Sequence, residues 1–200
     1  MSQLPDHPIR LAVIIASVRA GRLGPTVADW LVGRASERPD LAVDRIDLLD
    51  HPLPLALPSP EHPPSAEAAE VRARLGARLA AADAFIVVTP EYNHSFPAPL
   101  KNVLDWFLDE WAAKPVGFVS YGGLAGGLRA VEHLRQVFAE LHAVTVRETV
   151  SFHNAWTRFD ERGVPAPAGE AEAAAKALLD QLCWWAEALR TARAVRPYRR

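Results

Sequence analysis

The chain has 200 residues, of which half are hydrophobic and 23% are charged, and its formal net charge at pH 7 is −2. This length suits one domain with a sizeable core, and the composition is that of an ordinary soluble globular protein. Because Lys and Arg are scattered along the chain, no basic face indicates nucleic-acid binding. The single cysteine, Cys183, excludes an intrachain disulfide framework and a cysteine-cluster metal site.

No segment of the sequence is typical of a secretory signal or of a membrane span. Residues 1–10 lack a charged start followed by a long apolar run. The apolar runs elsewhere reach only six to eight residues, which is too short to cross a bilayer. We therefore expect a cytoplasmic protein made of a single domain, residues 1–200, without a membrane partner.

Short apolar segments rich in β-branched or aromatic residues predict the strands. Four of them are bounded by turn-forming residues, as buried strands are, and lie at 11–16, 84–89, 116–121 and 143–150. A fifth segment, residues 41–48, alternates between apolar and polar side chains and is typical of an edge strand.

A helical pattern follows each predicted strand. Apolar residues recur at helical spacing after Gly24-Pro25, from Ser65, from about Ala98 to Trp111, after Gly126-Gly127 and from about Glu170 to Arg193. This strict alternation implies a parallel sheet with helices on both faces, so the sequence predicts a doubly wound five-stranded α/β fold, a three-layer sandwich. The expected strand order is 2-1-3-4-5, one of the common orders of such sheets.

The loop after the first predicted strand has the composition of a phosphate site. Residues 16–26 offer hydroxyl groups at Ser17 and Thr26 and a guanidinium fork at Arg19, and a predicted helix opens at Gly24. The positive end of that helix favours an anion, and so does an arginine that can make paired hydrogen bonds. The loop matches neither a Walker A motif nor a GxGxxG fingerprint, and an ordinary strand-to-helix turn would also explain it.

Two further loops have backbones suited to a flat ring. After the third strand, two prolines within residues 90–97 favour a rigid extended loop with free N–H and C=O groups. After the fourth strand, the four glycines of residues 122–127 let the backbone approach a ligand closely. A plain turn and a mobile linker would explain each loop alone. In the expected order, however, the first, third and fourth strands are neighbours, so all three loops open into one crevice.

These three segments resemble the NADPH-dependent FMN reductase family, which includes quinone, azo-dye and chromate reductases. The matching stretches are Ala16-Ser17-Val18-Arg19, Pro90-Glu91-Tyr92-Asn93 with the following Pro99-Leu100-Lys101-Asn102, and Tyr121-Gly122-Gly123. The similarity covers roughly residues 9–150, and the PEYN stretch is its most specific part. One departure is Ala16, where the family usually has glycine, and its methyl group would tighten the turn.

The resemblance implies a flavodoxin-like fold that binds FMN and uses NADPH or NADH as electron donor. It implies that the FMN phosphate is held by Ser17, Arg19, Gly24 and Thr26, with Arg22 as an addition. It implies that the isoalloxazine is bordered by Pro90, Glu91, Tyr92 and Asn93 on one side and by Ser120, Tyr121, Gly122 and Gly123 on the other. Hydride transfer needs no side-chain base and the histidines lack metal-ligand spacing, so we expect no catalytic side chain and no metal.

The predicted function is an FMN-dependent oxidoreductase that passes electrons from NAD(P)H to a quinone, azo compound, free flavin or metal oxyanion by a ping-pong mechanism. A flavodoxin-like electron carrier is one alternative, although a net charge near zero offers little field for docking a redox partner. A non-catalytic flavin-binding redox module is a second. A reductase that supplies reduced FMN to a monooxygenase is a third.

Bulky apolar residues on the third and fourth predicted helices indicate a homodimer or homotetramer. Trp106 and Trp111 would lie on different sides of the third helix, which gives that helix more apolar surface than one sheet face needs. The sequence leaves open the physiological acceptor, the preference between NADPH and NADH, and the roles of His94 and of the segments 51–64 and 152–169.

Overall fold

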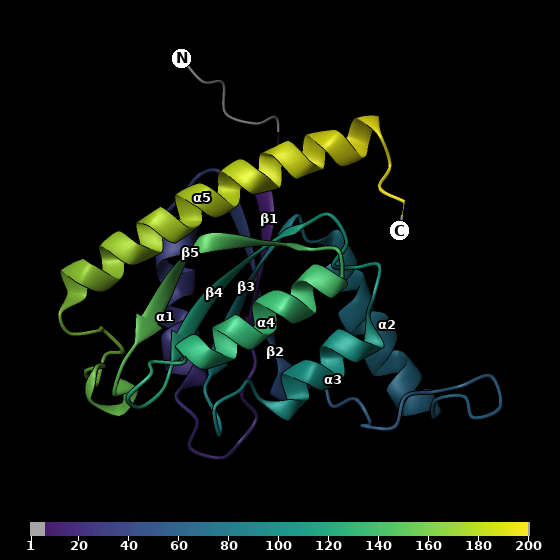
Figure 1. Cartoon of the computed structure of the whole chain (residues 1–200), viewed down its shortest axis with the longest axis horizontal. Coiled ribbons are helices and arrows are strands. Elements are labelled where there is room, and N and C mark those ends of the chain that lie inside the picture. Colours follow the sequence, from purple (N-terminus) through teal and green to yellow (C-terminus); the bar gives the residue numbers. More distant parts are fainter. Residues whose placement is uncertain (1–6, 200) are drawn as a thin grey trace.

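The computed structural model describes residues 7–199, in which strands and α-helices alternate (Figure 1). The strands are β1 (Ile9–Ile15), β2 (Leu41–Asp47), β3 (Ala84–Pro90), β4 (Pro115–Tyr121) and β5 (Val144–Phe152). The α-helices are α1 (Gly24–Ser36), α2 (Ala66–Ala81), α3 (Ala98–Trp106), α4 (Leu128–Glu140) and α5 (Ala168–Val195). Short 3-10 turns follow β2 at Leu48–Asp50 and β5 at Ala155–Thr157.

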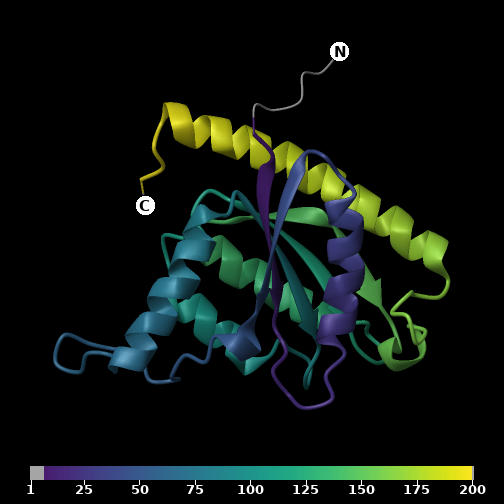
Figure 2. The same cartoon turned by 180° about the vertical axis from the view of Figure 1, so that it is seen from behind.

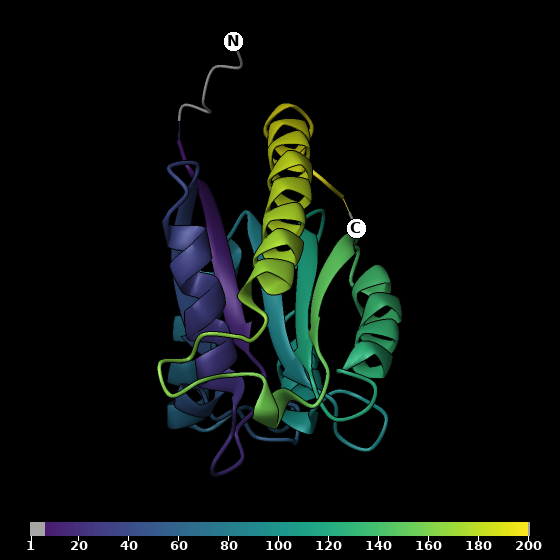
Figure 3. The same cartoon turned by 90° about the vertical axis from the view of Figure 1, so that its left-hand side faces the viewer.

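All strand pairs are parallel, and the sheet order is β2-β1-β3-β4-β5. Helices α1 and α5 pack on one face of the sheet and α2, α3 and α4 on the other, which gives three layers (Figure 3). The segment between β2 and α2 projects from the carboxyl edge of the sheet (Figure 2). The predicted flavodoxin-like fold, its strand order and the edge position of the second strand are confirmed.

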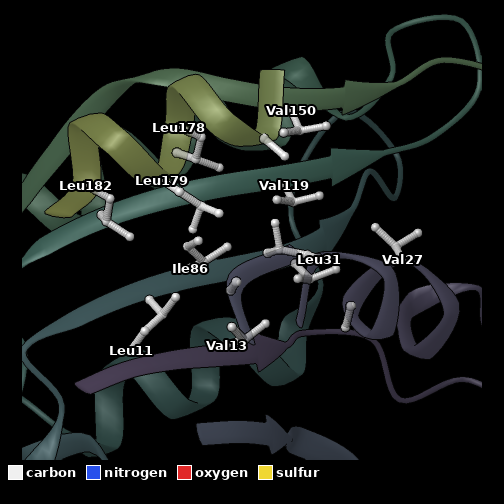
Figure 4. Close-up of a cluster of buried hydrophobic side chains, with 14 of the residues drawn as sticks. Leu11, Val13, Val27, Leu31, Ile86, Val119, Val150, Leu178, Leu179 and Leu182 are labelled. Carbon is white, nitrogen blue, oxygen red and sulfur yellow. The ribbon is translucent and has the colours of Figure 1, made fainter. Parts of the chain in front are cut away.

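Two apolar clusters hold the sheet between its helix layers. Strands β3 and β4 are buried along their whole length, so their side chains are apolar on both faces and their sequences are almost continuous apolar runs. In the cluster under α1 and α5, Val13, Ile86 and Val119 of the sheet pack with Leu31 and Leu178 of the helices (Figure 4). The helix positions that face the sheet are therefore fixed by apolar periodicity.

Helix α3 is shorter than the sequence predicted. It ends at Trp106 because Phe107 adopts an extended backbone, with φ −129° and ψ 132°. The chain then turns, and Trp111 is fully buried against Phe85 and Phe138 with its ring nitrogen donating to the Phe107 carbonyl at 2.8 Å. Apolar residues occur beyond the end of the helix because they pack in the core without being helical. The predicted helix boundary at Trp111 is therefore wrong.

The tryptophans of this region do not form an oligomer surface. Trp106 is buried as well, and its ring nitrogen donates to the Pro54 carbonyl at 2.9 Å. Trp106 and Trp111 are both buried in the core, so the prediction that they provide surface for self-association is wrong. Large apolar side chains that do reach solvent include Leu124 and Trp156, which lie in the loops after β4 and β5.

The longest helix, α5, has 28 residues but only one apolar side. Leu178, Leu179 and Leu182 are buried against the sheet, whereas Lys176 and Asp180 form an exposed ion pair on the outer side. Within residues 7–199, no helix combines the length and the apolar character that crossing a membrane requires.

Candidate active site

Loops from neighbouring strands meet at the carboxyl edge of the sheet, as the strand order predicts (Figure 1, lower edge). A hollow of about 350 Å³ lies between them. Its walls come from residues 19–23 after β1, residues 90–92 at the end of β3, residues 121–123 at the end of β4 and residues 155–156 after β5. We call this space the hollow.

Most of the predicted site residues line the hollow. They are Arg19, Arg22, Pro90, Glu91, Tyr92, Tyr121, Gly122 and Gly123. The others lie outside its lining, and they are Ser17, Gly24, Thr26, Asn93 and Ser120. The structure thus brings the three predicted loops together. Several of their residues, however, lie behind the lining of the hollow and do not face it.

Ser17 and Tyr121 join the loop after β1 to the end of β4. The Tyr121 hydroxyl donates to Ser17 Oγ at 3.1 Å, and both side chains are buried. Burial raises the pKa of Tyr121 above its ordinary value, so the hydroxyl stays protonated and remains a donor. Gly24 allows this contact, because a Cβ there would press on Ser17 Oγ and lie 2.9 Å from the Tyr121 hydroxyl.

Arg22 is occupied by an internal ion pair. Its guanidinium donates to the two carboxylate oxygens of Asp47 at 2.6 and 2.7 Å and to the Ser17 carbonyl at 2.5 Å. Burial raises the pKa of Asp47, but the hydrogen bonds and charge of Arg22 outweigh burial and leave that pKa below its ordinary value. Arg22 therefore anchors the loop after β1 to the end of β2.

Arg19 presents the unpaired charge of this loop. Its side chain is exposed, and its guanidinium carbon lies 5.5 Å from the centroid of the Tyr92 ring. No ion pair joins it to a carboxylate within residues 7–199. The aromatic ring favours a position of the guanidinium at the wall of the hollow, where an anion can reach it.

Glu91 turns its carboxylate toward helix α4. The carboxylate accepts hydrogen bonds from the Arg129 N–H at 3.2 Å and from the Arg129 guanidinium at 3.0 Å. The Glu91 N–H donates to the Tyr121 carbonyl at 3.1 Å. Glu91 thus ties the loop after β3 to the start of α4, and its charge is balanced there.

The glycine-rich loop after β4 is fixed by hydrogen bonds from two serine side chains. The hydroxyls of Ser120 and Ser151 donate to the Gly126 carbonyl at 2.9 and 2.8 Å. Gly126 and Gly127 have φ of 60° and 86°, a left-handed backbone that glycine adopts most readily. Ser120 therefore supports this loop, and the position beside the ring that the resemblance implies for it stays a prediction.

The segment after β5, whose role the sequence left open, completes the hollow. The N–H groups of Asn154 and Ala155 donate to the carbonyls of Gly123 and Gly122, each at 3.0 Å. These bonds bring the Trp156 ring over Gly123, where a Cβ would lie 3.3 Å from it. In the sequence, the feature that indicates this contact is an aromatic residue, Trp156, soon after β5, the strand that pairs with β4.

Thr26 and Asn93 are not brought to the hollow. The Thr26 methyl group lies near Gly163 in the loop before α5, where a Cβ on that glycine would be 3.4 Å from it. Asn93 and His94 form the tip of a turn with φ of 48° and 74°, and backbone hydrogen bonds between Tyr92 and Ser95 close that turn.

Comparisons with known proteins agree with this geometry. The family model of NADPH-dependent FMN reductases matches residues 9–157. An NAD(P)H-dependent FMN reductase of Schizosaccharomyces pombe is 39% identical over 121 residues, which cover 59% of this chain and 60% of that protein. Probable NADPH:quinone oxidoreductase 2 of Oryza sativa subsp. japonica is 34% identical over 170 residues, 78% of each chain.

Among solved structures, the flavoenzyme NAD(P)H:(acceptor) oxidoreductase FerB of Paracoccus denitrificans superposes with a TM-score of 0.71. It shares 23% sequence identity, and the match covers 90% of this chain and 98% of FerB. The parallel sheet and the loops at its carboxyl edge thus define a protein of the flavodoxin-like class. Within that class, the chain belongs to the NADPH-dependent FMN reductase family. The prediction of an FMN oxidoreductase that uses NAD(P)H is confirmed.

The contact at Gly24 can be tested by substitution. Gly24→Ala is expected to lower the free energy of unfolding by about 1–3 kcal/mol, because the new methyl group meets Ser17 and Tyr121. Gly33→Ala on the same helix has open space around its Cβ and is expected to gain up to about 1 kcal/mol. Urea unfolding measures both, and equal midpoints for the two variants would contradict the close packing.

Proposed function

We propose that this FMN oxidoreductase passes the electrons of NAD(P)H to small neutral or anionic acceptors, with quinones first among them. The observation that carries the proposal is the hollow, in which one unpaired arginine stands beside two backbone walls. Relatives support the acceptor class, since one is a 2-hydroxy-1,4-benzoquinone reductase of a Burkholderia species that is 31% identical over 146 residues.

The donors around the hollow fit the phosphate of FMN. A phosphomonoester carries nearly two negative charges, and the Arg19 guanidinium is free to make charge-assisted hydrogen bonds to it. The Ser17 oxygen already accepts from Tyr121, so the Ser17 hydroxyl hydrogen is left to donate. The start of α1 at Gly24 adds partial positive charge.

The walls of the hollow fit the flat ring of FMN. The Gly122 and Gly123 positions carry no side chain on one wall, and residues 90–92 form the other with the Glu91 carboxylate turned away. We propose that Pro90, Tyr92, Tyr121 and these glycines border the ring. Arg22, Thr26, Asn93 and Ser120 would then act as supports of the loops.

When bound, FMN supplies the acceptance of hydride from NAD(P)H and the delivery of electrons to the second substrate. The residues of the chain would bind and orient it. Glu91 is paired with Arg129, and burial raises the pKa of Tyr121 further from neutrality. The sheet and its loops would border one face of the FMN ring. NAD(P)H and the electron acceptor would then share the other, open face.

We also propose that the chain forms a homodimer or homotetramer. The support is an apolar surface beside the hollow, where Leu124 is 86% exposed and Trp156 is 70% exposed. Large apolar side chains of this kind are commonly covered by a symmetry-related copy. A cytoplasmic location also stays a prediction.

The phosphate assignment is tested by Arg19→Ala. Loss of a charge-assisted hydrogen bond is expected to weaken FMN binding by about 1.5–3 kcal/mol, roughly 10- to 150-fold. Arg19→Lys should recover only part of the FMN affinity, because lysine lacks the paired N–H groups of the guanidinium. Riboflavin affinity should not change, and Arg72→Ala, which removes an exposed arginine on α2, is the matched control. Wild-type FMN affinity in Arg19→Ala would refute the assignment.

The function itself is tested by steady-state kinetics. With NADH or NADPH and a quinone, the flavin-loaded protein is expected to give parallel double-reciprocal lines, because one open side forces the donor to leave before the acceptor enters. Excess acceptor should inhibit competitively against the nicotinamide. Intersecting lines would contradict the shared side, and failure to oxidise NAD(P)H without a separate reductase would favour an electron carrier.

A further inference from the structure

A larger cavity lies at the amino edge of the sheet, opposite the hollow. It has a volume of about 760 Å³, and its walls come from the segments at the starts of β4 and β5, from the last turns of α5 and from residues 196–199. Figure 1 shows the end of α5 at the upper edge of the molecule, away from the loops that form the hollow. We call this space the amino-edge cavity. It shares no lining residue with the hollow, so it is not part of the proposed flavin site.

The charge at the wall of the amino-edge cavity is positive. In the described part of the chain its lining contains no carboxylate and three arginines, which are Arg193, Arg196 and Arg199. Arg196 and Arg199 are exposed, and within residues 7–199 neither forms an ion pair. The nearby carboxylates of Asp109 and Glu110 line an adjacent cavity that shares Arg193, but they do not line this one. An anion would therefore meet cationic groups here without an acidic neighbour in the wall.

Arg193 is fixed at this wall and shares its counter-charge. Its guanidinium donates to the Ala113 carbonyl at 2.5 Å and lies 3.6 Å from the Asp83 carboxylate. Asp83 also lies 3.5 Å from the guanidinium of Arg10 and 3.7 Å from that of Arg190. Burial lowers the pKa of Arg193, and repulsion by Arg190 and Arg10 adds to this effect while Asp83 opposes it. One carboxylate thus serves three guanidinium groups, which leaves an excess of positive charge beside the cavity.

The rest of the lining is mostly apolar. It consists of Ala113, Val144, Leu189, Ala192 and Pro197, with His142 and Tyr198 as the other polar residues. His142 Nδ1 and the Tyr198 hydroxyl are joined by a hydrogen bond of 2.7 Å, which holds the segment after α5 against the start of β5. The volume falls within the roughly 300–1,000 Å³ that is usual for small-molecule sites. The cavity therefore offers a ligand both apolar contact and positive charge.

The backbone of the lining is strained at two positions. Ala113 and His142 have φ of 53° and 60°, in the left-handed region that residues other than glycine seldom adopt. The Ala113 N–H donates to the His142 carbonyl at 2.8 Å, so the two strained positions are joined. Within residues 7–199, the other non-glycine residues of positive φ are in the loops that form the hollow, at Asn93, His94 and Asn154. Such strain clusters at functional sites, so its presence here supports a second binding site.

We propose that the amino-edge cavity binds a small organic carboxylate, an apolar body of about two rings with one carboxylate group that accepts hydrogen bonds from the guanidinium groups of the lining. The apolar walls contact the body of the ligand. A neutral ligand would leave the arginines without a counter-charge, and an inorganic anion would leave the apolar walls uncovered. This site is independent of the assignment of FMN to the hollow.

The test uses flavin-loaded protein and two probes of the same shape. Naphthoate carries a carboxylate, and naphthamide carries a neutral amide in the same position. In calorimetric titrations naphthoate is expected to bind at least about 10-fold more tightly, as one charge-assisted hydrogen bond allows, and this preference should shrink as salt is raised. Naphthoate should shift the backbone amide resonances of Ala113 and Val144, whereas those of Gly122 and Gly123 in the hollow should stay in place.

Substitutions at exposed positions sharpen the result. Arg196→Gln combined with Arg199→Gln should weaken naphthoate binding about 10-fold and leave naphthamide binding unchanged, because only charged donors are lost. Arg72→Gln, at an exposed position on α2, is the matched control and should leave both affinities unchanged. Failure of naphthoate to bind, equal affinities for the two probes, wild-type naphthoate affinity in the double variant, or shifts at Gly122 and Gly123 without a shift at Ala113 would each overturn the proposal.

Discussion

The parallel pairing of β1 with β3 decides where the site lies. The chain runs from β1 out to β2 at the edge and returns to β3 on the other side of β1, so the loops after β1 and β3 leave the sheet in opposite directions. A gap between such loops is the general ligand position of open α/β sheets. Since β4 pairs with β3, its loop borders the same gap, and the Tyr121–Ser17 hydrogen bond reaches across it.

Within this frame, charge pairing determines what the hollow can bind. Arg22 is neutralised by Asp47, and Glu91 is neutralised by Arg129, so these groups fix loops and add little net charge. Arg19 differs because the group beside it is the Tyr92 ring, which leaves its charge unbalanced. The arrangement concentrates positive charge at one wall of a hollow whose other walls are mostly backbone. This is the distribution that a ligand with one anionic group and one neutral ring requires.

The sequence predicted the fold because continuous apolar runs mark buried parallel strands, and it predicted the loops because their composition is unusual. It could not predict the Arg22–Asp47 pair, which depends on the register of β1 with β2. Nor could it place Trp156 over Gly123, which depends on backbone bonds between two loops. The end of α3 was missed because apolar residues such as Trp111 serve the core in either conformation.

We propose that the loop after β1 binds the phosphate of the flavin. Calorimetric titration of the apoprotein with FMN and with riboflavin tests it most directly, because the two ligands differ only in that phosphate. We expect FMN to bind at least about 10-fold more tightly than riboflavin, as one charge-assisted hydrogen bond requires, and the difference to shrink as salt is raised. Equal affinities for FMN and riboflavin would contradict it.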